Sequence, residues 1–167
     1  MSQPPVIADY DPEWPRLFER EAAAVGAAVE GVRRIEHVGS TAVPGLAARP
    51  TIDLLAGADS PAAVDAGALA ALGYTEATDV RSRTPGRRLF WKGTPAFRTY
   101  ELHLVREGGT VWERALAFRE RLRSDLDLAE RYAHHKRQVA RLYADSPGAY
   151  AEANVTFADA VLQGTDL

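Results

Sequence analysis

The chain has 167 residues, no cysteine, and 20 basic against 23 acidic side chains, for a net charge of −3. This length predicts one domain with its own core, and the missing cysteines exclude disulfides, cysteine-ligated zinc, iron–sulfur clusters and a thiol nucleophile. With no signal-peptide pattern and no apolar run near the roughly 20 residues that span a bilayer, we expect a cytoplasmic protein that does not bind membranes. The net charge gives no overall basic field for nucleic acid, which we do not expect as a partner, although it leaves a local basic groove open.

The first half of the chain alternates between helical patterns and short strand patterns. Asp11-Pro12 is typical of a helix N-cap followed by the first helical position, and Ser60-Pro61 repeats this pattern. Apolar and β-branched runs between and after these helices predict strands. The expected helices are residues 11–31 and 60–73, and the expected strands are residues 6–8, 33–38, 51–57, 74–78, 87–91 and 98–105. A polar loop, residues 79–86, separates the fourth strand from the fifth.

Beyond residue 109 the sequence pattern predicts helices throughout. Ser124 with Asp127 three residues later forms a capping pattern, and Ser146-Pro147 predicts a further helix start. The expected helices are residues 110–123, residues 124–144 and one that begins at residue 147. The sequence therefore predicts an α+β fold in one domain, 1–167. Residues 1–107 form a small mixed sheet flanked by helices, and the helices of residues 108–167 close one side of a cleft.

The most informative stretch is HVGSTAVPGLAARPTIDLL, residues 37–55. A strand enters the Gly39-Ser40 turn, where glycine lets the backbone approach a ligand and the following hydroxyls and N–H groups can bind phosphate. Asp53 is a single carboxylate in an otherwise apolar strand, and a buried carboxylate needs a cation, a metal ion or backbone donors. The alternative is that the glycines only make turns and that Asp53 pairs with Arg49.

This stretch resembles the GrpB family, a group within the nucleotidyltransferase superfamily that is related to DNA polymerase beta. Gly39-Ser40 matches the superfamily's turn and Asp53 matches its first acid. The similarity covers nearly the whole chain, from DYDPEWPRLFERE through LHLV to FRERLR and the pair Tyr132 and Lys136. The resemblance implies a nucleotidyltransferase-like, DNA polymerase beta-type fold. It also implies a nucleotide-linked or accessory role, because the family's domain occurs fused to dephospho-CoA kinase.

The acids of the superfamily motif are only partly present. Leu55 stands two residues after Asp53, where the resemblance implies a second acid. Glu101 and His103 lie two apart on a later strand, so their side chains point to one face. A two-metal site needs acids that bridge both ions. We therefore expect Asp53, Glu101 and His103 to hold a single Mg²⁺ or Mn²⁺, and to be the catalytic residues if the chain is an enzyme.

Several cations are candidates for binding an anionic ligand. Lys136 lies on an apolar helix stripe with Tyr132, where it can contact phosphate or extend past its packed stem to solvent. Arg119 and Arg123 lie one turn apart, where they can reach the same cleft or form surface ion pairs. His37 is either a phosphate or metal contact or a hydrogen-bonded strand histidine. The expected phosphate-binding residues are His37, Gly39, Ser40, Thr41, Arg49, Arg119, Arg123, Tyr132 and Lys136.

These residues support three hypotheses for function. In the first, the cleft binds a nucleotide or another phosphorylated or anionic ligand with one divalent cation, and transfers a nucleotidyl or related group by positioning and electrostatics. In the second, which Leu55 favours, the chain is a non-catalytic module that docks on another enzyme. In the third, Glu101 or His103 is a general base for other chemistry on an anionic small molecule. The oligomeric state stays open.

Overall fold

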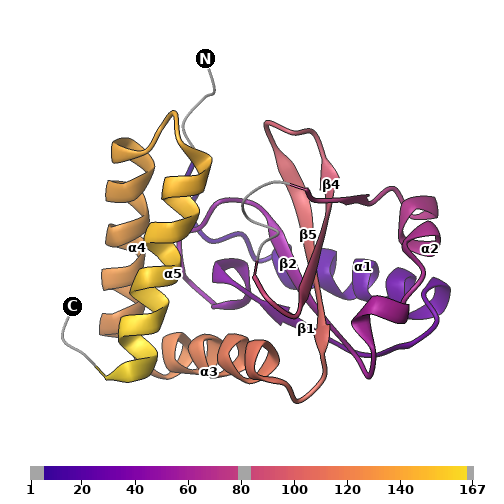
Figure 1. Ribbon diagram of the computed structural model, residues 1–167. Helices are drawn as coiled ribbons and strands as arrows, with labels where there is room; N and C mark the ends of the chain where they lie inside the picture. The colour runs from indigo at the N-terminus through magenta and orange to yellow at the C-terminus, as the bar shows by residue number, and fades with distance from the viewer. Residues whose placement is uncertain (1–5, 79–83, 165–167) are drawn as a thin grey trace.

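A computed structural model describes residues 6–78 and 84–164, so part of the predicted loop 79–86 lies outside the described residues. The strands form one five-stranded sheet with the order β1-β2-β5-β4-β3. They are β1 (Val32–Val38), β2 (Ile52–Ala58), β3 (Thr75–Glu76), β4 (Arg87–Gly93) and β5 (Arg98–Arg106). The central pair β2–β5 is parallel and the other pairs are antiparallel. The predicted α+β class, with a mixed sheet flanked by helices, is confirmed (Figure 1).

Each face of the sheet has its own apolar layer. On one face, α1 (Trp14–Ala28) packs Val25 into a cluster that includes Leu54 and Leu102. On the other face, Trp112 of α3 (Thr110–Ser124) packs against Leu55 and its neighbours. Gly57 of β2 makes room for this tryptophan, because a Cβ at Gly57 would lie 2.8 Å from the indole ring. The alternating side chains of β2 therefore serve both layers.

The C-terminal helices α4 and α5 pack together beside the sheet (Figure 1). α4 (Leu126–Leu142) and α5 (Pro147–Gln163) share a cluster of buried side chains with Val43 and Leu46 of the loop that follows β1. This loop begins with a single 3₁₀ turn, η1 (Ser40–Ala42). The Gly-Ser segment that sequence reasoning singled out thus lies between the sheet and the helices. Among the described residues, no helix is long and apolar enough to cross a membrane.

The first two predicted elements differ from the structure. Residues 6–8 form no strand and contribute a single antiparallel bridge, from Ala8 to Ala48. The predicted N-cap at Asp11 is wrong, because α1 begins at Trp14. The Asp11 carboxylate instead accepts a hydrogen bond from the Glu13 backbone N–H at 2.9 Å, which closes a turn ahead of the helix.

Two further predicted caps are wrong because a nearby aspartate is the actual cap. Asp65 caps α2 (Ala66–Ala71) by accepting from a backbone N–H at 2.8 Å, and Pro61–Ala63 forms a separate 3₁₀ turn, η2. Asp125, not Ser124, caps α4, since its carboxylate accepts from Leu128 N–H at 2.9 Å. Aspartate and serine cap almost equally well, so local spacing alone cannot choose between neighbours.

The central core can be tested at Leu102 of β5, which is 0% exposed in the apolar layer that α1 covers. Replacing it by alanine removes buried methyl groups and leaves a cavity, so we expect Leu102→Ala to lower the free energy of unfolding by about 2–5 kcal/mol. Urea denaturation followed by circular dichroism measures this. Leu142→Ala is the control, because Leu142 is 74% exposed and should change stability by less than about 0.5 kcal/mol. Equal losses in both variants would contradict the assigned core.

Candidate functional site

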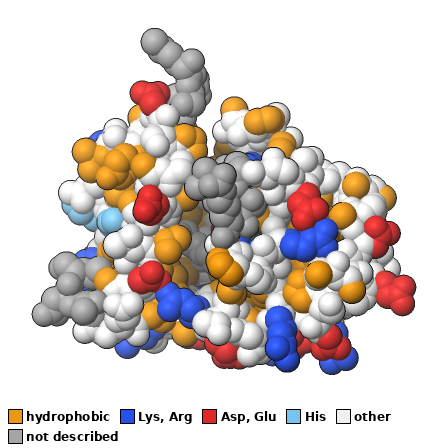
Figure 2. Space-filling model, viewed as in Figure 1, with side chains coloured by type: hydrophobic (Ala, Val, Ile, Leu, Met, Phe, Trp, Pro, Cys, Tyr) orange, Lys and Arg blue, Asp and Glu red, His pale blue; other side chains and the backbone are white. Residues whose placement is uncertain are grey.

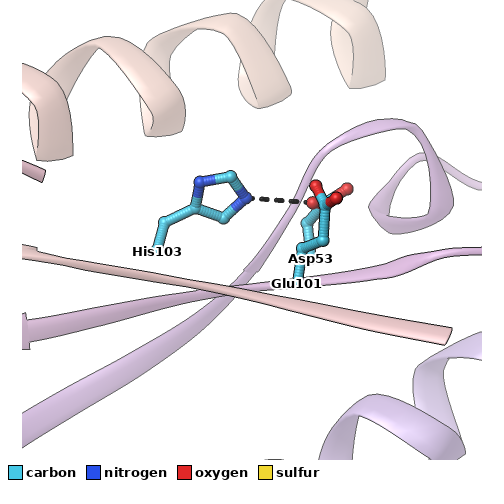
Figure 3. Close-up of side chains that lie close together, drawn as sticks. All are labelled: Asp53, Glu101 and His103. Carbon is cyan, nitrogen blue, oxygen red and sulfur yellow. Dashed lines mark hydrogen bonds and ion pairs between the residues drawn. The ribbon is translucent and has the colours of Figure 1, made fainter. Parts of the chain in front are cut away.

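Asp53, Glu101 and His103 meet on the sheet face that α3 covers. In the parallel β2–β5 register, Asp53 lies opposite Glu101, and Leu55 lies opposite His103. The three side chains therefore project from one face, and one ligand atom of each lies within 4.8 Å of the others. Figure 3 shows the two carboxylates side by side, with the imidazole turned toward them. The structure thus brings together the three residues predicted to hold a metal ion.

The His103 imidazole has two polar neighbours. Its Nε2 lies 3.0 Å from Asp53 Oδ1. Its Nδ1 lies 3.5 Å from Nη1 of Arg87, which projects from β4 two residues before the partner of His103 in the β4–β5 register. Arg87 was not predicted as a site residue. Its place beside His103 depends on the pairing of β4 with β5, and the alternation of apolar residues fixes the face of a side chain but does not exclude a shift of two residues along the strand.

Glu101 is held by arginines from two directions. Its carboxylate accepts from Arg98 Nη1 at 3.2 Å, and Arg49 Nη2 lies 3.8 Å from the same oxygen. The Arg98 and Glu101 side chains are each 8% exposed, and the Arg98 guanidinium lies 5.0 Å from the centre of the Trp91 ring. The alternative pairing of Arg49 with Asp53 is not what the structure shows, because Arg49 forms its ion pair with Glu101. Sequence reasoning missed Arg98, although it precedes Glu101 by only three residues on β5.

Position 39 requires glycine for two reasons, its backbone conformation and the closeness of the Asp53 side chain. Its φ is +72°, in the region that side chains disfavour, and a Cβ at this position would lie 2.4 Å from Asp53 Oδ2. The glycine therefore lets the turn after β1 approach the Asp53 carboxylate directly. Ser40 follows at the start of η1, where its side chain lies within hydrogen-bonding reach of the Tyr132 phenol. The close approach predicted at Gly39 occurs, and the group approached is Asp53.

The helical side of the site is formed by α4. Lys136 is 3% exposed, and its ammonium donates to the Ala47 carbonyl at 2.6 Å while lying 4.7 Å from the centre of the Tyr132 ring. Burial, followed by the positive charge of Arg137, lowers the pKa of Lys136 to about 7, against the opposing effect of Asp53. Burial also raises the pKa of Tyr132 well above its ordinary value. Tyr132 and Lys136 therefore form the side of the site that α4 contributes, where Tyr132 is a neutral phenol and Lys136 is a buried amine.

Tyr150 of α5 is a second tyrosine near the cluster. Burial raises its pKa, and the charges of Arg49 and Asp53 both act on its hydroxyl. Sequence reasoning did not select it. A signal was available, because Tyr150 and Asn154 repeat the four-residue spacing of Tyr132 and Lys136 on the preceding helix. Asn154 uses its amide to donate to the Tyr150 carbonyl at 3.0 Å.

His37 and Thr41 lie away from the cluster of Asp53, Glu101 and His103. His37 pairs with Leu54 in the β1–β2 register, so it faces the α1 layer, where its ring stacks on Phe18 at 4.6 Å. Its Nε2 lies 2.9 Å from the buried Thr41 hydroxyl. Burial, followed by the charges of Arg123 and Arg119, lowers the pKa of His37 to about 4. The structure therefore places His37 as a hydrogen-bonded strand histidine, the second of its two readings.

Arg119 and Arg123 contact the loop from behind. Arg119 pairs with Glu36 at 2.8 Å and donates to the His37 carbonyl at 2.9 Å. Arg123 donates to the Ala42 carbonyl at 2.9 Å. These contacts fix the backbone on both sides of the Gly-Ser turn, and the structure does not bring either guanidinium to the Asp53 cluster.

The donor set of the cluster suits one hard divalent cation. Carboxylate oxygens are ligands for Mg²⁺ and Mn²⁺, and an imidazole is better tolerated by Mn²⁺. The negative charge of Glu101 is offset by its ion pairs with Arg98 and Arg49. Asp53 has only the neutral or protonated imidazole of His103 as its ion-pair partner among the described side chains. Asp53 is therefore the acid with the most negative charge left for a cation.

A separate groove of about 940 Å³ runs between α4 and α5. Figure 2 shows hydrophobic side chains gathered over the end of this helix pair where α4 stops, and Leu142 and Tyr143 are among the exposed apolar residues. His135 lines the groove and contacts the Ala153 carbonyl through Nε2 at 3.2 Å. None of the residues predicted to bind phosphate or metal lines this groove.

The contact between Gly39 and Asp53 can be separated from the cost of a positive φ. Gly45 has a similar φ of +79°, but a Cβ there would meet nothing within 4 Å. Both Gly39→Ala and Gly45→Ala impose a positive φ on alanine, and Gly39 has in addition a ψ of −172°, a conformation that costs other residues roughly 1–3 kcal/mol. Only Gly39→Ala also displaces the Asp53 carboxylate, so in urea denaturation we expect Gly39→Ala to cost less stability in an Asp53→Ala background than in wild type, and Gly45→Ala to cost the same in both. An equal cost of Gly39→Ala in the two backgrounds would contradict the close approach to Asp53.

The burial of Lys136 predicts a pH-dependent stability. Its pKa is about 7 in the folded protein against an ordinary 10.5, so between these values the unfolded chain binds more protons and the folded state gains stability as the pH rises. Lys136→Met removes this effect. Urea denaturation measures the free energy of unfolding of the variant minus that of wild type. We expect this difference to be most favourable to the variant at pH 6 and to fall toward pH 10, because the wild type gains stability over that range. A difference that does not change with pH would contradict a lowered pKa.

Comparison with known proteins identifies the family to which this chain is similar. The family model described as "GrpB protein" matches residues 4–164. The UPF0157 protein BH1888 of Halalkalibacterium halodurans is 34% identical over 165 residues, which cover 94% of this chain and 80% of that protein. The glutamate-rich protein GrpB of Alkalihalophilus pseudofirmus is 28% identical over 164 residues, which cover 94% and 93%.

A solved structure agrees with these sequence matches. The crystal structure of the conserved protein GrpB from Enterococcus faecalis is similar with a TM-score of 0.80 and 32% sequence identity, covering 95% of this chain and 98% of that chain. The resemblance to the GrpB family is therefore confirmed over almost the whole chain. The chain belongs to the GrpB family.

Proposed function

We propose that this chain binds a nucleotide or another phosphorylated ligand together with one divalent cation, Mg²⁺ or Mn²⁺, where the sheet faces the C-terminal helices. The observation that carries the proposal is the convergence of Asp53, Glu101 and His103 within 4.8 Å. All three project from neighbouring strands, so their spacing is fixed by the sheet and not by mobile side chains alone. A bound cation supplies positive charge for the oxygens of a phosphate.

The surroundings of the cluster supply further groups for an anion. Arg49 lies beside Glu101 on the loop side, and the charge of Lys136 acts across the site from α4. Ser40 and the backbone of η1 lie next to Asp53, because Gly39 allows the close approach. Lys136 has the Ala47 carbonyl as its hydrogen-bond acceptor among the described residues. An ammonium can donate three hydrogen bonds, so an anion would complete its contacts.

Transfer of a nucleotidyl or related group is the reaction class that we propose for this site. Transfer at phosphorus is catalysed chiefly by positioning and by electrostatic stabilisation, and a preorganised cluster of charges supplies both. The resemblance to the nucleotidyltransferase superfamily supports this class. In this role Asp53 holds the cation, and Arg49 and Lys136 bind the phosphate.

A second candidate function is favoured by Leu55. This residue stands where the superfamily pattern has a second acid, and it is 1% exposed within a cluster with Val38, Val105 and Trp112. The position therefore belongs to the apolar core under α3 and has no access to a ligand. A transferase fold without its second acid can serve as a binding module that assists another enzyme.

Calorimetric titration with a panel of nucleoside triphosphates, each with Mg²⁺ or Mn²⁺, tests the proposal. We expect the wild type to bind at least one of them, and Asp53→Asn to weaken binding by at least roughly tenfold, because the neutral amide is a poor ligand for a hard cation. Asp59→Asn is the control, because Asp59 pairs with the exposed Arg33 at the other end of β2. It should leave binding unchanged.

The same proteins separate the two candidate functions. Turnover of the bound nucleotide by the wild type, lost in Asp53→Asn, supports the transferase. Binding without turnover supports the accessory module. A wild-type protein that binds no nucleotide with either cation would contradict the proposal.

A further inference from the structure

We infer that His103 serves this site as a hydrogen-bond donor that positions Asp53, and that the cation is held by carboxylate oxygens without the imidazole. The role of the cation rests on the proposed function. The position of the His103 proton does not, because it follows from contacts within the protein alone. Figure 3 shows the imidazole with one nitrogen directed at the carboxylates and the other directed away from them.

Both polar contacts of His103 constrain its proton. The guanidinium of Arg87 has only N–H donors, so the Nδ1 atom that lies 3.5 Å from Arg87 Nη1 must present its lone pair. An ionised aspartate has only acceptors, so the Nε2 atom that lies 3.0 Å from Asp53 Oδ1 must carry the hydrogen. The two contacts select the same neutral tautomer, with the proton on Nε2.

The orientation of the ring is fixed by the same pair of contacts. Rotating the imidazole by half a turn about its Cβ–Cγ bond exchanges Nε2 with Cε1 and Nδ1 with Cδ2. A carbon would then face the Asp53 carboxylate, and a second carbon would face Arg87. Both hydrogen bonds would be lost from a side chain that is only 18% exposed, and water could not fully replace them. The observed orientation is therefore the one that satisfies His103.

This arrangement conflicts with a role for His103 as a metal ligand. An imidazole that binds a cation through Nε2 carries its proton on Nδ1, and metal-binding histidines present that N–H to a carboxylate, a carbonyl or water. Here Nδ1 faces the guanidinium of Arg87, which has no acceptor. Moving the proton to Nδ1 would direct an N–H bond at a cation.

The consequence for Asp53 is a carboxylate held from two sides. Oδ1 accepts from His103, and Oδ2 faces the Cα of Gly39, which leaves no space for a side chain. A donor that orients a ligating carboxylate improves metal binding without touching the metal. His103 thus acts through Asp53 and is a positioning residue.

Nitrogen-15 NMR of the imidazole side chains tests this directly. Long-range correlation spectra distinguish the two neutral tautomers, and His103→Gln identifies the His103 signals among the four histidines. We expect the Nε2–H tautomer in the free protein, and we expect it to persist when Mg²⁺ alone is added to saturation. An Nδ1–H tautomer in the free protein, or a shift of the proton to Nδ1 with Mg²⁺, would overturn the inference.

Two variants test the positioning role through the affinity for Mn²⁺, measured by titration calorimetry. His103→Gln keeps an N–H near the position of Nε2, so we expect it to bind Mn²⁺ within about threefold of wild type. His103→Ala removes the donor, and we expect a loss of roughly 10–100-fold, the usual effect of removing a group that orients a ligand. Urea denaturation shows that both variants are folded.

The remaining outcomes are equally decisive. Equal losses in both variants would show that the imidazole itself binds the cation, and unchanged affinity in both would show that His103 does not position Asp53; either result overturns the inference. If wild type binds neither Mn²⁺ nor Mg²⁺, the proposed function fails. The tautomer of the free protein then decides the inference alone, and the Nδ1–H form overturns it.

Discussion

The parallel pairing of β2 with β5 is the constraint on which the site depends. It places Asp53 beside Glu101 and puts His103 one step further along the same face, although these residues come from distant parts of the chain. Parallel neighbours need a crossover connection, and here the connection runs through α2, β3 and β4. Because β4 then returns along the other edge of β5, it adds Arg87 and Trp91 to the same face. One pairing thus gathers acids, imidazole and guanidinium.

Buried charge in this region is balanced locally, by short contacts from several elements. Glu101 is neutralised by Arg98 from its own strand and by Arg49 from the loop. The Lys136 ammonium contacts the Ala47 carbonyl and the Tyr132 ring, and its pKa is lowered by burial and then by the charge of Arg137. An unpaired buried charge is costly. The balance leaves Asp53 and Lys136 as the two groups whose charges are least compensated, on opposite walls of one site.

Much of this arrangement could be predicted from the sequence, and the failures have physical causes. The two-residue spacing predicted that Glu101 and His103 share a face, and the resemblance to the nucleotidyltransferase superfamily implied that Asp53 joins them, as it does in the structure. The sequence did not predict which face of the sheet His37 occupies. That face follows from the pairing of β1 with β2, which turns His37 toward Phe18 of α1. Arg119 and Arg123 were predicted to reach the cleft or to form surface ion pairs, and the structure shows ion pairs of both with Glu120 together with contacts to the carbonyls of His37 and Ala42. Arg87 lies beside His103 because of the β4–β5 pairing, which a two-residue shift would change without altering the alternation of apolar residues. Arg98 lies three residues before Glu101 on the same strand, a spacing that regular alternation assigns to opposite faces.

The glycine at position 39 has a meaning beyond its own turn. Its missing Cβ is the space that Asp53 Oδ2 occupies, so the two positions share one volume. A chain in which residue 53 became small would still need glycine at position 39, because φ +72° with ψ −172° is a conformation that essentially only glycine adopts. A change from glycine at position 39 would therefore alter both the turn after β1 and the space that the Asp53 carboxylate occupies. In any aligned set of relatives, such a change would point to chains in which this turn no longer approaches residue 53.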